Sequence, residues 1–130
     1  MADRSGDWFA QARRDLDHAA DASEHGHFEW ACFSSQQGAE KAVKAVYLRL
    51  HGESWGHSVL KLLQGLADKV SISESLLDAA RALDRHYIPT RYPNGFDQGS
   101  PGDYYTRKEA EEAIAYAGQI VGFCESLLCG

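Results

Sequence analysis

The chain has 130 residues with 13 basic and 19 acidic side chains, which give it a formal net charge of −6. This acidic balance excludes a histone-like protein that coats nucleic acid with its whole surface. Hydrophobic residues make up 44% and charged residues 25%, proportions that are typical of a folded chain rather than a disordered one. We expect one domain over residues 1–130, with any contact to a polyanion confined to a part of its surface.

The sequence predicts a cytoplasmic protein that does not enter a membrane. Its apolar runs are too short to span a bilayer, and charged residues interrupt the amino-terminal segment, where a signal peptide needs an apolar stretch. The three cysteines are odd in number and lack a CxxC pair, which is typical of reduced thiols. We expect Cys32 and Cys124 to be small buried apolar side chains.

Apolar residues recur at the three- and four-residue spacing of amphipathic helices through most of the chain. The pattern runs from Ser5 to about Glu24, and it resumes after Gly26 and continues to Leu50. The second of these segments is apolar over more than one stripe, which indicates a helix that is central or lies in a subunit interface. We infer from this breadth that the chain forms a homodimer.

Two further helices are predicted in the middle of the chain. One covers residues 58–66, and the next begins after Ser73 and continues to Tyr87. Pro89 should end the latter, because the residue before a proline avoids the helical region.

The stretch from residue 89 to residue 106 contains all three prolines and is predicted to be irregular. Loops of this length without structure of their own are usually functional or disordered. Thr106 and Glu109 then have the spacing of a capping box, which opens a last helix to about Leu127. Since no segment alternates polar and apolar residues like a strand, we expect an all-α, up-and-down bundle of about five helices, four in the core and one more.

The sequence lacks the motifs that mark metal and phosphate sites. The six histidines form no His-x3-His pair, and the Glu-x-x-His spacing from Glu24 to His27 straddles Gly26, where a helix should break. Neither a phosphate-binding glycine loop nor the GxSxG of hydrolases occurs. We therefore expect no metal site and no cofactor, and we expect His57 to be an N-cap or loop anchor of the third helix.

Basic residues are concentrated in one part of the chain. Residues 81–108 contain five basic and three acidic side chains, or +2, whereas the rest contains eight basic and sixteen acidic ones, or −8. Arg85, Arg91 and Tyr92 belong to this part, and arginine interleaved with aromatic residues suits phosphate contact and base stacking. The alternative is that the two arginines pair with nearby aspartates and fix the loop.

Two lysines of the second helix are further candidates for contact with a nucleotide. Lys41 and Lys44 lie three residues apart, on one helical face. The alternative interpretation is that both belong to a solvated edge.

Arg81 and His86 are the candidate catalytic pair. Five residues turn an ideal helix by about 500°, so the two side chains lie about 140° apart and need a symmetry mate or a frayed turn to meet. His86 falls in the predicted last turn, where unpaired carbonyl groups should raise its pKa. Such a histidine can move protons while a guanidinium stabilises charge on a phosphate, although a lone histidine at a helix end is also common as a structural residue.

The chain contains SQQGAEKAVKA at residues 35–45, HSVLKLL at 57–63 and LDRHYIPTRYPN at 83–94. Together these stretches resemble the HEPN domains, the higher eukaryote and prokaryote nucleotide-binding family, and the similarity extends from about Trp8 to Leu127. The resemblance implies an up-and-down helical bundle that is commonly a homodimer.

The resemblance also implies two alternative functions. Small prokaryotic members are often encoded beside a minimal nucleotidyltransferase, with which they form toxin and antitoxin pairs. We therefore expect a nucleotide- or RNA-binding module with that partner. Other members are metal-independent endoribonucleases with an Arg-x4-6-His motif at the dimer groove, which Arg81-x4-His86 matches. In that alternative His86 moves protons and Arg81 stabilises the phosphate during attack by a ribose 2′-hydroxyl.

Overall fold

The structure is a computed structural model that describes residues 3–129. Its long elements are α1 (Ser5–Glu24), α2 (Phe28–Arg49), α4 (Glu74–Asp84) and α6 (Arg107–Cys129). The short elements are α3 (Val59–Gly65), the 3-10 turn η1 (Pro93–Gly95) and α5 (Pro101–Tyr104). The described residues contain no strand, so the predicted all-α class is confirmed.

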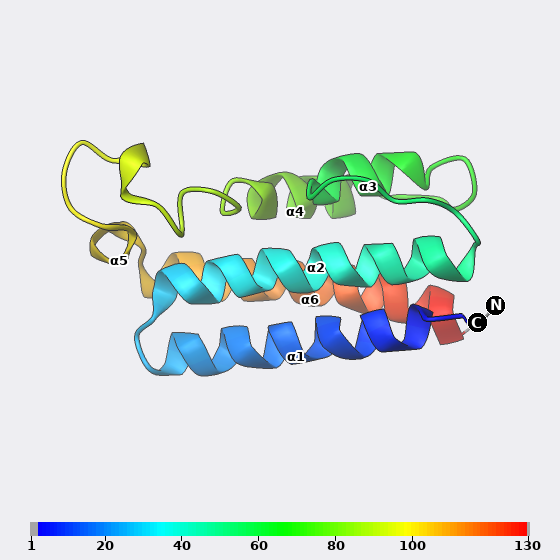
Figure 1. The fold of residues 1–130 in the computed structure, drawn as a ribbon, viewed down its shortest axis with the longest axis horizontal. Coiled ribbons are helices and arrows are strands. Elements are labelled where there is room, and N and C mark those ends of the chain that lie inside the picture. The colour runs from blue at the N-terminus through cyan, green and yellow to red at the C-terminus, as the bar shows by residue number, and fades with distance from the viewer. Residues whose placement is uncertain (1–2, 130) are drawn as a thin grey trace.

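Helix α2 occupies the centre of the bundle (Figure 1). It packs against α1 on one side, against α3 and α4 on the other, and against α6 behind it. The helices α1, α2, α4 and α6 run in alternating directions in chain order, which confirms the up-and-down bundle. The broad apolar surface of α2 follows from this central place, because twelve of its residues are buried.

Small side chains bring the helices of the core close together. A Cβ atom at Gly38 would lie 3.1 Å from Ala12 O, so a larger residue there would require α1 to shift by a few tenths of an ångström. Leu63, Leu83 and Ile120 are the largest apolar side chains that are fully buried. They bring α3, α4 and α6 onto the same core as α2.

The three cysteines are unpaired. Cys32 and Cys124 are buried, and this burial raises the pKa of each thiol to about 12. Both thiols therefore remain protonated and pack as small apolar side chains, as the sequence predicts. Cys129, the last residue of α6, is exposed.

The end of α4 differs from the prediction. The helix ends at Asp84 rather than at Tyr87, and the chain continues in turns to Arg91. In these turns Thr90 Oγ1 donates to His86 O at 2.6 Å, and the guanidinium of Arg91 donates to Tyr87 O. Side chains thus satisfy carbonyl groups that a longer helix would have left at its end.

The stretch predicted to be irregular, residues 89–106, contains two short helical elements. Helix α5 has Pro101 at its start, and Asp103 accepts a hydrogen bond from Ser100 N at 2.9 Å, a capping box that the sequence analysis missed. The rings of Phe96 and Tyr104 stack at 4.3 Å. The stretch therefore folds on itself at one end of the bundle (Figure 1).

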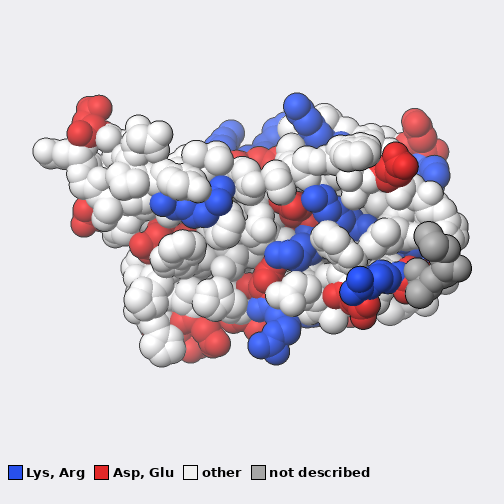
Figure 2. All heavy atoms as spheres, in the orientation of Figure 1, with Lys and Arg blue, Asp and Glu red and all other residues white. Residues whose placement is uncertain are grey.

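The surface charge is mixed. Figure 2 shows acidic and basic side chains intermixed over one face, without a broad basic area. The local +2 of residues 81–108 therefore does not produce a large basic patch on this face, and a polyanion would have to be recognised there by a few placed groups.

Asp84 fixes α3 to the end of α4. Its carboxylate accepts hydrogen bonds from Val59 N at 2.9 Å, from Leu60 N at 3.0 Å and from Ser58 Oγ at 2.9 Å. Gln36 of α2, which is fully buried, donates to the same carboxylate at 3.4 Å. One side chain thus binds the first N–H groups of α3 and links three helices.

Replacement of Asp84 by alanine should lower the free energy of unfolding by about 2–4 kcal/mol, because charge-assisted bonds are lost and partly buried N–H groups lose their acceptor. Urea unfolding followed by circular dichroism measures the loss. Asp78→Ala is the control: Asp78 lies on the same helix, is exposed and pairs with Arg81, so its loss should cost under about 1 kcal/mol. Equal losses in the two variants would contradict the role given to Asp84.

Candidate functional site

The three sequence stretches at residues 35–45, 57–63 and 83–94 meet on one side of α2. Gln36 Nε2 donates to His57 O at 2.8 Å, which joins the first stretch to the second. His57 and Tyr87 stack with ring centroids 5.0 Å apart and planes inclined by 19°, which joins the second stretch to the third. Tyr87 and Gln36 were not predicted as site residues, because their contacts form only in the folded chain.

Glu40 is the buried charge beneath this site. Its side chain is 5% exposed and lies 3.1 Å from Lys44 Nζ and 3.1 Å from His57 Nδ1. Gln37 Nε2 also donates to it at 3.3 Å. The sequence gives one indication of this site, since a glutamate interrupts the apolar pattern of α2. The pattern does not show that Glu40 pairs with His57, which lies seventeen residues away.

His57 differs in part from its predicted role. Ser58 is the N-cap of α3, since its hydroxyl accepts a hydrogen bond from Lys61 N. The prediction that His57 would be the N-cap is therefore wrong. His57 does anchor the loop through its carbonyl group, and its imidazole, which is 57% exposed, pairs with Glu40.

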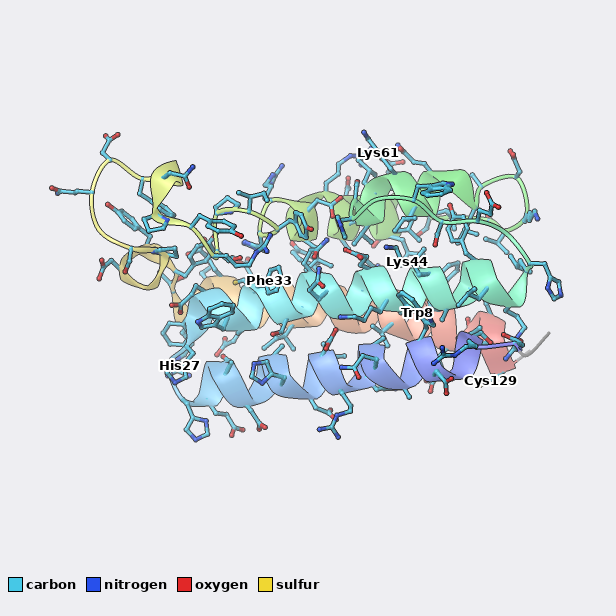
Figure 3. All side chains as sticks on the ribbon, viewed as in Figure 1. Trp8, His27, Phe33, Lys44, Lys61 and Cys129 are labelled. Carbon is cyan, nitrogen blue, oxygen red and sulfur yellow. The ribbon has the colours of Figure 1, made fainter. Side chains whose placement is uncertain are left out.

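Four rings form a continuous row beside α2, which we call the aromatic row: Trp30, Phe33, Tyr87 and His57. Trp30 meets Phe33 edge to face at 6.2 Å, and Phe33 lies 6.2 Å from Tyr87. Figure 3 shows Phe33 on the side of α2 that faces the viewer, with Lys44 further along the same helix. The row therefore runs from the first turn of α2 to the start of α3.

Arg91 is enclosed by aromatic rings. Its guanidinium carbon lies 4.4 Å from the ring centroid of Phe33, 4.7 Å from that of Tyr87 and 5.2 Å from that of Tyr92. Nε and one Nη donate to Tyr87 O at 2.9 Å and 2.7 Å. Arg91 is thus fixed by rings and a carbonyl group, and not by the aspartate pairing that was the alternative.

Arg81 and His86 do not meet within one chain. Arg81 Nη1 donates to Glu74 at 3.1 Å and to Asp78 at 2.7 Å, and these hydrogen bonds raise the pKa of Arg81. The ring of His86 instead lies edge-on to Tyr105, with centroids 5.6 Å apart. The literal match to Arg-x4-6-His is therefore not an assembled pair in this structure.

His86 lines a separate cavity of about 260 Å³ together with Arg85 and the α6 residues Glu109, Glu112 and Tyr116. Its Nδ1 atom is buried and has no hydrogen-bond partner among the described residues. Burial lowers the pKa of His86, opposed by Glu109 and assisted by Arg85. The predicted rise in its pKa is wrong, because α4 ends before His86 and the side chain is partly buried.

The two lysines of α2 are held in ion pairs. Lys41 Nζ lies 2.5 Å from Asp15 and Lys44 Nζ lies 3.1 Å from Glu40. Their side chains are only 25% and 13% exposed, so they do not form the solvated edge that was the alternative. Lys44 belongs to the site through Glu40, whereas Lys41 and the exposed Arg85 lie outside the aromatic row.

Within residues 3–129, no group of three His, Cys, Asp or Glu side chains is placed to hold a metal ion. In the same range, no helix is long and apolar enough to cross a membrane.

Replacement of His86 by glutamine should flatten the pH dependence of stability. Since the folded-state pKa of His86 lies below its ordinary value of 6.5, the unfolded chain binds the proton more tightly. The native state therefore loses stability as the pH falls through 6.5 toward the folded pKa. Urea unfolding at about pH 7.5 and about pH 5.5 should show this loss in the unchanged protein and a smaller one in the variant.

His18→Gln is the matched control for this experiment. His18 is exposed on α1, so this variant should keep the pH dependence of the unchanged protein. The interpretation fails if His86→Gln keeps it as well.

Comparison with known proteins identifies relatives over nearly the whole chain. A solved structure of a Thermus thermophilus protein, TT1696, is 44% identical with a TM-score of 0.94, and the match covers 97% of this chain and 99% of that one. An archaeal HEPN homologue, ST0689, is 40% identical with a TM-score of 0.82, covering 97% and 98%. A HEPN domain protein of Thermotoga maritima is 44% identical with a TM-score of 0.77, covering 94% and 97%.

A candidate toxin of Methanocaldococcus jannaschii is 27% identical over 128 residues, which cover 91% of this chain and 84% of the relative. The family profile named HEPN domain matches residues 5–127. This range includes the whole aromatic row and the long helices up to the last two residues of α6. The chain therefore belongs to the HEPN domain family.

Proposed function

We propose that this chain is a nucleotide- or RNA-binding module of the toxin–antitoxin type that holds its ligand at Arg91 and the aromatic row. The observation that carries the proposal is the position of Arg91 over three rings. Its hydrogen bonds to Tyr87 O use only part of a guanidinium that has five N–H groups. The other donors are available to a phosphate oxygen, and the rings hold the group in place before the ligand arrives.

Exposed aromatic side chains beside Arg91 supply surfaces for bases. Tyr92 is 49% exposed and Trp30 is 46% exposed. Stacking of a base on such a ring contributes about 1–3 kcal/mol and tolerates any base. A ligand that combines phosphates with unpaired bases fits this site better than a duplex, whose bases are stacked on one another.

The toxin–antitoxin part of the proposal draws on the relatives. One relative is the candidate toxin of Methanocaldococcus jannaschii, and small HEPN proteins of this kind resemble those encoded beside a minimal nucleotidyltransferase. We take such an enzyme as the proposed protein partner. The proposed assembly of the chain itself is a homodimer.

A second candidate function is metal-independent cleavage of RNA by Arg81 and His86 at a homodimer groove. It is favoured by the buried Nδ1 atom of His86, which has no hydrogen-bond partner among the described residues, because an unpaired buried polar atom is uncommon in folded proteins. In this function Arg81 would have to exchange Glu74 and Asp78 for a phosphate, and the two residues would come from different subunits.

Binding of a fluorescein-labelled single-stranded RNA, measured by anisotropy at constant low salt, tests the proposed site. Tyr92→Ala should weaken binding about 10-fold, the loss of one stacked base. Arg91→Ala should weaken it by at least as much, and Arg91→Lys should not restore it, because an ammonium cannot bind a carbonyl and a phosphate in the same planar geometry.

Arg13→Ala is the matched control for Arg91. Arg13 also lies over an aromatic ring, that of Phe9 at 5.3 Å, but it is paired with Glu125 away from the aromatic row. This variant should bind RNA like the unchanged protein. Unaltered binding in a Tyr92→Ala, Arg91→Ala double variant that still folds would refute the site.

Chromatography and light scattering test the proposed partner and the proposed homodimer. After co-expression with a minimal nucleotidyltransferase, the proposed partner, the chain should elute with that enzyme in size-exclusion chromatography. Alone, it should have the mass of two copies by light scattering. Elution as a monomer in both experiments would exclude both the proposed partner and the homodimer.

A further inference from the structure

A buried glutamate and two neighbouring side chains fix the orientation of His57. Both carboxylate oxygens of Glu40 lie within reach of His57 Nδ1, at 3.1 Å and 3.3 Å. The Gln36 amide binds the backbone carbonyl of His57, and the ring stacks on Tyr87. An exposed imidazole is normally free to rotate, but this one is held by a carboxylate and a ring, while the amide fixes the backbone that carries it.

The pairing with Glu40 decides which ring nitrogen of His57 carries a proton. An ionised carboxylate only accepts hydrogen bonds, so Nδ1 of His57 must donate. Nε2 of the neutral ring then carries the lone pair. The ammonium of Lys44, 3.1 Å from Glu40, pairs with the same carboxylate.

The free side of His57 opens to a place where a ligand can sit. The imidazole is 57% exposed and lines a cavity of about 130 Å³ with Ser58, Asp84 and Tyr87. Asp84 does not compete for the ring, since its carboxylate already accepts hydrogen bonds from the start of α3. Nε2 is therefore the atom of His57 that can accept a proton from a bound molecule.

His57 and Arg91 both contact the ring of Tyr87. The ring of Tyr87 lies 5.0 Å from the ring of His57 and 4.7 Å from the guanidinium carbon of Arg91. A phosphate that binds Arg91 would therefore be separated from His57 by the ring of Tyr87. His86, by contrast, has no carboxylate holding its ring and does not touch Arg81.

We propose that His57 is a catalytic base for RNA cleavage, with Glu40 as its positioning residue, a proposal that rests on RNA binding at Arg91. Nε2 takes the proton of a ribose 2′-hydroxyl, and the 2′-oxygen forms a bond to the adjacent phosphorus. The bond from phosphorus to the 5′-oxygen breaks, that oxygen leaves with a proton from water, and His57 returns its proton to water. The products are a 2′,3′-cyclic phosphate and a 5′-hydroxyl end.

The test uses purified protein in EDTA with a labelled single-stranded RNA, and the products are resolved on a gel. His57→Ala should lower the rate of cleavage at least about 100-fold, the usual contribution of a general base. Added imidazole should restore part of that rate, a rescue that a structural defect would not show. Glu40→Gln should lower the rate less and shift the Nδ1 and Nε2 signals of His57 in the NMR spectrum.

Two controls use the same preparation. His18→Ala removes an exposed histidine of α1 and should leave cleavage unchanged. An RNA with a single 2′-deoxyribose at the cleaved position should bind normally but resist cleavage there. This substrate keeps the test valid even if a protein variant fails to fold.

Binding and cleavage are measured on the same samples, so failure of the site and failure of the base are distinguishable. RNA that does not bind at all overturns the proposed function and the base with it. RNA that binds but yields no cyclic phosphate overturns only the base. Cleavage that persists in His57→Ala, or that is lost in His86→Ala while His57→Ala retains it, also overturns the assignment of His57.

Discussion

The carboxylate of Asp84 determines how two segments of the chain meet. Helix α3 has seven residues, too few to be stable by itself, and its first N–H groups are bound by this carboxylate at the end of α4. His57 precedes Ser58, the N-cap of α3, and Tyr87 follows the end of α4. The same contact that permits α3 to form therefore also sets the distance between the two rings that stack at the candidate site.

The central helix is stabilised by small apolar residues, but its buried surface also carries two long polar side chains. Gln36 is fully buried and Glu40 nearly so. Burial of such groups is costly unless they are paired, and both are paired with the segment at His57. These two polar side chains of α2 hold the segment at His57 in place. The position of that segment therefore depends on hydrogen bonds rather than on apolar packing.

The fold was predictable where a helix is long and its apolar spacing regular, as in α1, α2 and α6. The end of α4 was not, because it depends on bonds from Thr90 and Arg91 to carbonyl groups of the preceding turn. The pairing of Glu40 with His57 joins two helices and has no fixed spacing in the sequence. The spacing of Arg81 and His86 is visible in the sequence, but the early end of α4 and the burial of His86 separate them in space.

Arg91 has two tasks that use one side chain. Two of its N–H groups close the turn at Tyr87, and its remaining donors belong to the proposed site. A ligand that draws the guanidinium toward itself therefore pulls on the hydrogen bonds to the Tyr87 carbonyl group. The stability of the turn at residues 85–91 and the binding of ligand are then thermodynamically linked. Substitutions in this turn can therefore change the affinity for the ligand without contacting it.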